Sequence, residues 1–150
     1  MLGEPEFPRI VRRRSRVHGW GVFALEPITK NTRIIDYAGE LIDHKQSLKR
    51  ETRYLKQGCI WCFTVNRRWV RDANVGGNLA RFINHACKPN CYSHIVGKTK
   101  TIWIRAARNI ERGRRADLQL LHRRREADSV SMQAWLQDAS VIRWRTRRRC

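Results

Sequence analysis

A ten-residue stretch near the middle of the chain, residues 81–90, places the strongest limit on how this chain can fold. It holds two asparagines, a histidine, a cysteine and a proline, which together do not suit the interior of a helix. Pro89 biases the residue before it away from helical geometry, and asparagine favours turns because its side chain bonds to nearby backbone. Two interpretations stay open: a well-bonded surface turn, or a crossing of chain segments where amide groups meet a polar ligand.

The stretch reads Arg-Phe-Ile-Asn-His-Ala-Cys-Lys-Pro-Asn, and two other motifs precede it in the chain. The first is His18-Gly19-Trp20-Gly21, and the second is Tyr37-Ala38-Gly39-Glu40. In these three motifs and their order the chain resembles the SET-domain protein-lysine methyltransferases, whose signature has the form Asn-His-x-Cys-x-Pro-Asn after Arg-Phe. The resemblance covers residues 9–113 and then stops.

The resemblance implies one SET domain over residues 9–113, mainly of strands with little helix. Its β-clip-like fold would place small sheets around a knot-like crossing. The residue pattern agrees, because it shows no strand–helix–strand rhythm of a Rossmann sheet. The pattern predicts a short exposed helix at 43–56 and strands at 22–25, 33–37, 59–65, 69–72, 92–96 and 101–106.

The resemblance also implies a site for a methyl donor, S-adenosyl-L-methionine. The residues that would bind it are His18, Gly19, Trp20, Arg81, Phe82, Asn84 and His85. Tyr37 is the candidate catalytic residue, a tyrosine lining the lysine channel, and Phe63 is the candidate for the substrate groove. From the residues alone, Tyr37 also suits an aromatic side chain of the core, and Trp20 also suits a core anchor beside a tight turn.

Lysine methylation moves a methyl group from a sulfonium to a neutral amine. The protein must hold the two about 3 Å apart and exclude water. Removing water lowers the pKa of the substrate lysine, which favours its neutral form. A narrow channel of tyrosine and apolar side chains meets these needs, so we expect no metal site.

After Gly113 the sequence departs from the family pattern. The family continues with Glu-Glu-Leu-Thr-Tyr, a further tyrosine and a cysteine cluster, whereas this chain continues Arg-Arg-Ala-Asp-Leu-Gln-Leu. Those seven residues can be encoded so that reading one base later gives Glu-Glu-Leu-Thr-Tyr-Asn-Tyr. In that frame Met132-Gln133 must give cysteine, and Trp135-Leu136 must give glycine. We hypothesise that residues 114–150 are a frameshifted basic tail, that the C-terminal part of the domain is incomplete or disordered, and that activity is impaired.

The chain carries 32 Lys and Arg against 13 Asp and Glu, a formal charge of +19. Such a balance favours acidic partners, usually nucleic acid. If the tail is frameshifted, however, the part of this positive charge that it carries has no functional meaning. The alternative function is therefore a basic nucleic-acid or chromatin-binding module without catalysis. The arginine-rich residues 9–16 suit either a solvated edge strand or a patch that attracts such a partner.

Five cysteines and no apolar leader or membrane-length stretch favour a reducing intracellular setting. That would be cytoplasmic in a bacterium, and nuclear or chromosomal in a eukaryote. The expected partners are a lysine-bearing protein such as a histone and non-specific nucleic acid, but no membrane. A small zinc-binding domain is a third alternative, with Cys59, Cys62, Cys87 and Cys91 as its ligands, although Cys59 and Cys62 in an extended run would point to opposite faces.

Overall fold

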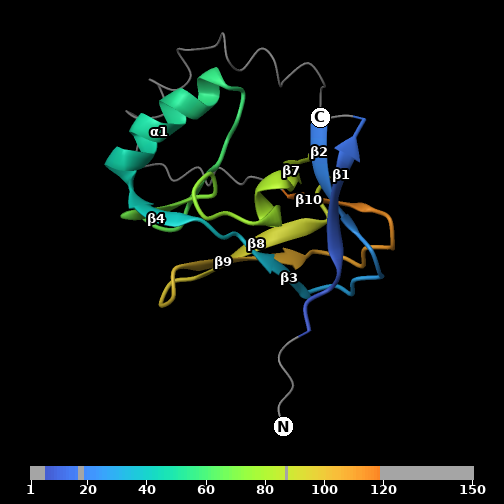
Figure 1. Ribbon diagram of the computed structural model, residues 1–150. Coiled ribbons are helices and arrows are strands. Elements are labelled where there is room, and N and C mark those ends of the chain that lie inside the picture. The colour runs from blue at the N-terminus through green and yellow to red at the C-terminus, as the bar shows by residue number, and fades with distance from the viewer. Residues whose placement is uncertain (1–5, 17–18, 87, 119–150) are drawn as a thin grey trace.

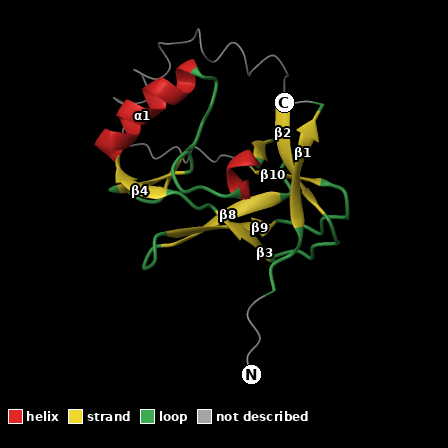
Figure 2. Cartoon of the chain, in the orientation of Figure 1, coloured by secondary structure: helices red, strands yellow, loops and turns green. Residues whose placement is uncertain are grey.

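The computed structural model describes residues 6–16, 19–86 and 88–118. This part of the chain is mainly strand with one α-helix, as the sequence predicts (Figures 1 and 2). The helical elements are α1 (His44–Lys56) and the 3₁₀ turn η1 (Leu79–Phe82). The strands are β1 (Ile10–Ser15), β2 (Gly19–Ala24), β3 (Arg33–Asp36), β4 (Glu40–Asp43), β5 (Cys62–Thr64), β6 (Trp69–Asp72), β7 (Asn84–His85), β8 (Cys91–Val96), β9 (Thr101–Ala106) and β10 (Arg115–Leu118).

The strands form two sheets. The larger has the order β1-β2-β10-β8-β9-β3, with β7 paired to β10, and the smaller has the order β4-β6-β5. Helix α1 packs on the smaller sheet, and Figure 1 shows it beside β4. Within the described residues, no helix is long and apolar enough to span a bilayer. This arrangement separates a larger core sheet from a small sheet that carries the helix.

The core follows the alternation of β9. Ile102, Ile104 and Ala106 are fully buried, while the residues between them are only half-buried. Inward apolar side chains from neighbouring elements complete this core, including Ala24, Ile28, Ile34, Cys91, Ile110, Ala116 and Leu118. The sequence predicted β9 with these faces, because successive side chains of a strand point to opposite sides.

Most predicted elements are confirmed, with changed bounds, and three strands were not predicted. The strand predicted over 59–65 is only β5, while β4, β7 and β10 have no counterpart in the prediction. Helix α1 begins as expected, because the Asp43 side chain accepts a hydrogen bond from the Gln46 N–H at 2.8 Å and caps the first turn. Its buried residues are Ser47 and Tyr54, and Leu48 is 60% exposed.

Residues 84–86 and Cys91 pair with strand β10. Asn84 and His85 of β7 pair in parallel with β10, and Leu118 of β10 also pairs with Cys91 of β8. The Ala86 N–H donates to the Leu118 carbonyl at 3.2 Å. The expected crossing is therefore formed by these two segments, which lie about thirty residues apart in the sequence.

A buried carboxylate joins α1 to the smaller sheet. Asp72 is fully buried, and its Oδ2 accepts from Arg50 Nη1 at 2.8 Å and from the Tyr54 hydroxyl at 2.7 Å. Its Oδ1 accepts from the Asn74 N–H at 2.9 Å. A Cβ at Gly39 would clash with the Asp72 carbonyl, so the glycine of the second motif permits this close approach.

Candidate functional site

A hydrogen bond joins the first motif to the third. Asn84 Nδ2 donates to the main-chain carbonyl of Trp20 at 2.8 Å, across 64 residues of sequence. His85 follows on β7 and is exposed, and Gly19 precedes Trp20 at the start of β2. Four of the predicted cofactor residues are thus brought together, while His18 lies outside the described residues.

Arginines of β1 lie over the aromatic rings of the two motifs. The Arg12 guanidinium lies 4.3 Å from the centre of the Trp20 ring and 4.8 Å from that of Phe82. Arg14, directly opposite Trp20 in the strand register, lies 4.8 Å from the same indole. Arg12 therefore bridges two predicted cofactor residues that belong to different motifs.

The contacts continue from Phe82 towards the predicted catalytic residue. Phe82 meets Trp61 edge-on at 6.2 Å, and Arg81 lies over both rings, at 4.8 and 5.2 Å. The Tyr37 hydroxyl donates to the Trp61 carbonyl at 2.9 Å, and the Tyr37 ring lies 5.2 Å from Phe63. We call the set Arg12, Arg14, Trp20, Trp61, Arg81 and Phe82 the aromatic–arginine row.

Tyr37 is buried at the end of this row. Burial raises the pKa of its hydroxyl, and the nearby Cys62 and Asp72 act in the same direction, so the phenol stays protonated at neutral pH. A protonated hydroxyl can donate, as it does here to Trp61. Tyr37 packs within the core cluster and also contacts Phe63, so its position suits both interpretations of this residue.

Trp20 is not a core anchor, because 37% of its surface is exposed. Gly19 beside it has φ +70°, a conformation that favours glycine, and a Cβ there would meet nothing within 4 Å. The early loop thus leaves open space next to an exposed indole. A ligand can reach both the ring and the main chain at this point.

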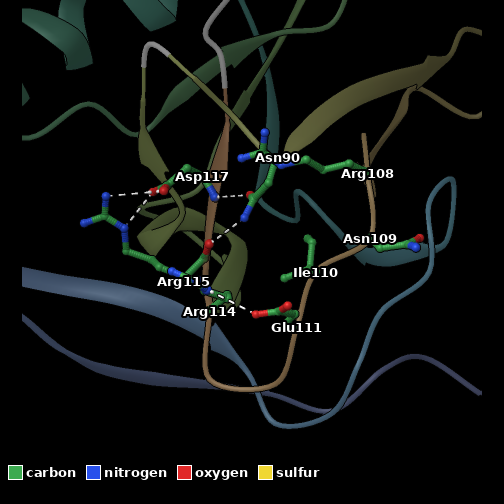
Figure 3. Close-up of a pocket in the computed structure, with 8 residues that line it drawn as sticks. All are labelled: Asn90, Arg108, Asn109, Ile110, Glu111, Arg114, Arg115 and Asp117. Atoms are coloured by element: carbon green, nitrogen blue, oxygen red, sulfur yellow. Dashed lines mark hydrogen bonds and ion pairs between the residues drawn. The ribbon is translucent and has the colours of Figure 1, made fainter.

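A cavity of about 490 Å³ lies at another point on the crossing (Figure 3). It is lined by Asn90, Arg108, Asn109, Ile110, Glu111, Arg114, Arg115 and Asp117, and thus by none of the predicted cofactor residues. Asn90 Nδ2 donates to the Arg115 carbonyl, and Asn90 Oδ1 accepts from the Asp117 N–H, both at 2.8 Å. The wall of this cavity is therefore the polar link that holds β10 against the 84–91 segment.

Asn90→Ala is expected to lower the free energy of unfolding by about 2–4 kcal/mol, because it leaves two backbone groups of β10 without these partners. Urea unfolding followed by circular dichroism measures the change. Asn109→Ala is the matched control, since that amide lines the same cavity but accepts from the exposed Lys30 N–H, and we expect a loss below about 1 kcal/mol. Equal losses in the two variants would contradict the role given to Asn90.

Sequence reasoning missed three members of the row, Arg12, Arg14 and Trp61. The basic residues 9–16 do form an edge strand, β1, which is one of the two outcomes considered for them. Arg12 and Arg14 are two residues apart, so both lie on one face of that strand. The register of these arginines with Trp20 could not be predicted from the sequence and is seen in the structure. The same is true of the contact between Trp61 and Phe82.

The described cysteines do not gather as metal ligands. Cys59 and Cys62 are half-buried free thiols, and burial raises the pKa of the buried Cys91 thiol to about 12. No three His, Cys, Asp or Glu side chains cluster within residues 6–16, 19–86 and 88–118. Cys87, which the zinc alternative also requires, lies outside those ranges.

Residues 19–114 match the SET domain family, so this chain belongs to that family. It is 44% identical over 109 residues to the histone-lysine N-methyltransferase set1 of Dictyostelium discoideum, covering 70% of this chain and 7% of that protein. It is 45% identical over 85 residues to the histone-lysine N-methyltransferase SETD1A of Homo sapiens, covering 55% and 5%. The chain thus spans only a small part of the length of these relatives.

A solved structure supports the same fold. A humanized mutant of the Chaetomium thermophilum Polycomb Repressive Complex 2, bound to the inhibitor GSK126, aligns with a TM-score of 0.66 and 30% identity. The alignment covers 76% of this chain and 15% of that one. The SET-domain fold predicted from three motifs is therefore confirmed.

Proposed function

We propose that this chain is the SET domain of a protein-lysine N-methyltransferase that uses S-adenosyl-L-methionine and acts on a histone or histone-like protein. The bond between Asn84 and Trp20 carries the proposal, because it unites two motifs that the family resemblance assigns to one cofactor site. The names of the relatives support the substrate class. In a eukaryote, such a protein would work in the nucleus.

The residues present fit the proposed cofactor. The row offers flat aromatic faces that suit an adenine ring and guanidinium groups that suit a carboxylate, and Gly19 leaves space beside them. The residues proposed to hold it are His18, Gly19, Trp20, Arg81, Phe82, Asn84 and His85. When bound, the cofactor supplies an electrophilic methyl group on a positively charged sulfur.

Tyr37 and Phe63 are proposed to form part of the lysine channel. The hydroxyl of Tyr37 is fixed by the Trp61 carbonyl, and the Phe63 ring packs against the Tyr37 ring. Their apolar surfaces exclude water from the substrate amine, which lowers its pKa and favours the neutral nucleophile. In this role Tyr37 positions the amine and the channel wall.

We further propose that residues 114–150 are a frameshifted translation and that the chain as written is impaired. Two observations support this hypothesis. The sequence departs from the family pattern after Gly113, and the shifted frame must encode cysteine at Met132-Gln133 and glycine at Trp135-Leu136. Sequencing the gene across codons 111–115 tests it directly. An uninterrupted frame with codons that do not encode the family pattern would remove the hypothesis.

The cofactor proposal is tested by thermal unfolding with S-adenosylhomocysteine. At about 100 times its dissociation constant, a ligand adds about 2.7 kcal/mol of stability, which corresponds to a rise of about 5 °C or more in Tm. Asn84→Ala is expected to abolish the rise. His94→Ala, an exposed change on β8, is the control and should keep it. The proposal would be contradicted if S-adenosylhomocysteine raised the Tm of neither chain, the one as written nor the frame-restored one.

A further inference from the structure

We propose that β1 and the exposed indole beside it form a binding strip for single-stranded nucleic acid. The strip consists of Arg9, Arg12, Arg13, Arg14, Arg16 and Trp20. It lies at the rim of the larger sheet, where Figure 1 shows β1 next to β2. Binding of nucleic acid here would be a further activity beyond methyl transfer, and it shares Trp20 and Arg12 with the site proposed for the cofactor.

The strip concentrates uncompensated positive charge. Residues 9–16 contain five arginines and no acidic residue. Arg9 pairs with Glu26 at 2.9 Å, but none of the other four forms an ion pair with a described residue. Strand β1 is an edge strand of six residues and about 20 Å, and it carries Arg12 and Arg14 on one face and Arg13 on the other. A line of charge is suited to a polyanion that tracks along it.

The strip also combines its arginines with an aromatic ring. Arg12 and Arg14 lie 4.3 and 4.8 Å from the centre of the Trp20 ring, which holds both planar guanidinium groups close to the indole. A stacked guanidinium keeps N–H donors at its edge that can bond to phosphate. More than a third of the Trp20 surface is still exposed. Bases of a single strand stack on such arginine and aromatic faces, whatever their sequence.

This combination favours a single strand over other acidic partners. A duplex keeps its bases stacked inside, so it would use the arginines but not the ring. An anionic membrane surface or an acidic peptide would also respond to charge alone. Trp20 therefore distinguishes the proposed partner, since only unstacked bases gain from an exposed indole that has two guanidinium groups beside it.

The experiment measures fluorescence anisotropy of a labelled fifteen-base oligothymidylate with the full chain at several salt concentrations. The double variant R12Q/R14Q is expected to bind about tenfold more weakly at 0.1 M salt. Its slope of log affinity against log salt should fall by about 1.4, or about 0.7 for each lost phosphate contact. The matched control is R67Q/R68Q, which removes the same charge at the turn between β5 and β6, where Arg68 lies over Trp69 at 5.0 Å. We expect the control to weaken binding less than about threefold.

Trp20→Ala provides the second arm, because it keeps every charge. It is expected to weaken binding of the oligonucleotide about fivefold or more, and circular dichroism checks that each variant is folded. Equal losses in the two double variants, or unchanged binding in Trp20→Ala, would overturn the proposal. The proposal would also be overturned if anionic lipid vesicles or polyglutamate bound as tightly as the oligonucleotide and lost as much affinity in R12Q/R14Q. Charge alone would then explain binding to the strip.

Discussion

Reading the gene one base later from codon 114 is expected to raise methyl transfer at least about 100-fold over the chain as written. The restored segment would supply the tyrosines and cysteines that the family pattern places after Gly113. Without them we expect the site to be partly open to water, and a reacting group misplaced by about 1 Å costs about 100-fold in rate. The measurement is transfer of tritium from labelled S-adenosyl-L-methionine to a histone-derived peptide, with both chains at equal concentration.

Two variants of the frame-restored chain serve as controls. Asn84→Ala is expected to return activity to the level of the chain as written, because it removes the bond to the Trp20 carbonyl. His94→Ala should keep full activity, because that side chain is exposed on β8. Equal rates in the restored chain and the chain as written would refute the proposed impairment, even if both bind S-adenosylhomocysteine.

Asp72→Ala is expected to lower the free energy of unfolding by about 3–5 kcal/mol. The change deprives the Tyr54 hydroxyl and the Asn74 N–H of their acceptors, and it leaves Arg50 without its buried partner. Breaking a buried charge pair by removing one member typically costs this much. Because these groups join α1 to the smaller sheet, urea unfolding should show the loss, and the helical circular dichroism signal should fall first.

Glu40→Ala is the matched control for Asp72→Ala. Glu40 contacts the same Arg50 at 2.6 Å, but 43% of its side chain is exposed. Ion pairs that water reaches contribute about 1 kcal/mol or less, so the expected loss is below that value. A loss in Glu40→Ala as large as that in Asp72→Ala would show that burial does not set the strength of this network.

The sequence predicted elements with regular spacing and missed those that depend on distant partners. Strand β9 followed from the alternation of Ile102 and Ile104. Strand β10 was not predicted, because it is held by backbone pairing with β2, β7 and β8, which are distant in the sequence. Ala116 and Leu118 still point into the core there, and Arg115 and Asp117 pair with each other at 2.7 Å on the opposite face.

Helix α1 also has a feature that depends on a distant partner and could not be predicted from the sequence. The sequence predicted a short exposed helix, and Leu48 is 60% exposed, but the prediction named no buried face, and that face carries Tyr54. Tyr54 turns inward because Asp72, eighteen residues later, accepts its hydroxyl hydrogen. In the site, the proximity of Trp20 and Asn84 came from the family resemblance, and no spacing rule gives a contact across 64 residues.

The interior place of β10 has a consequence for how the protein is made. Strands near both ends of the described chain must meet before the larger sheet is continuous, since β10 lies between β2 and β8. Contacts of such long sequence separation slow folding, so a nascent chain on the ribosome cannot complete this sheet until residue 118 has emerged. A premature stop before Arg115 would therefore remove a central strand and split the sheet into two exposed halves prone to aggregation.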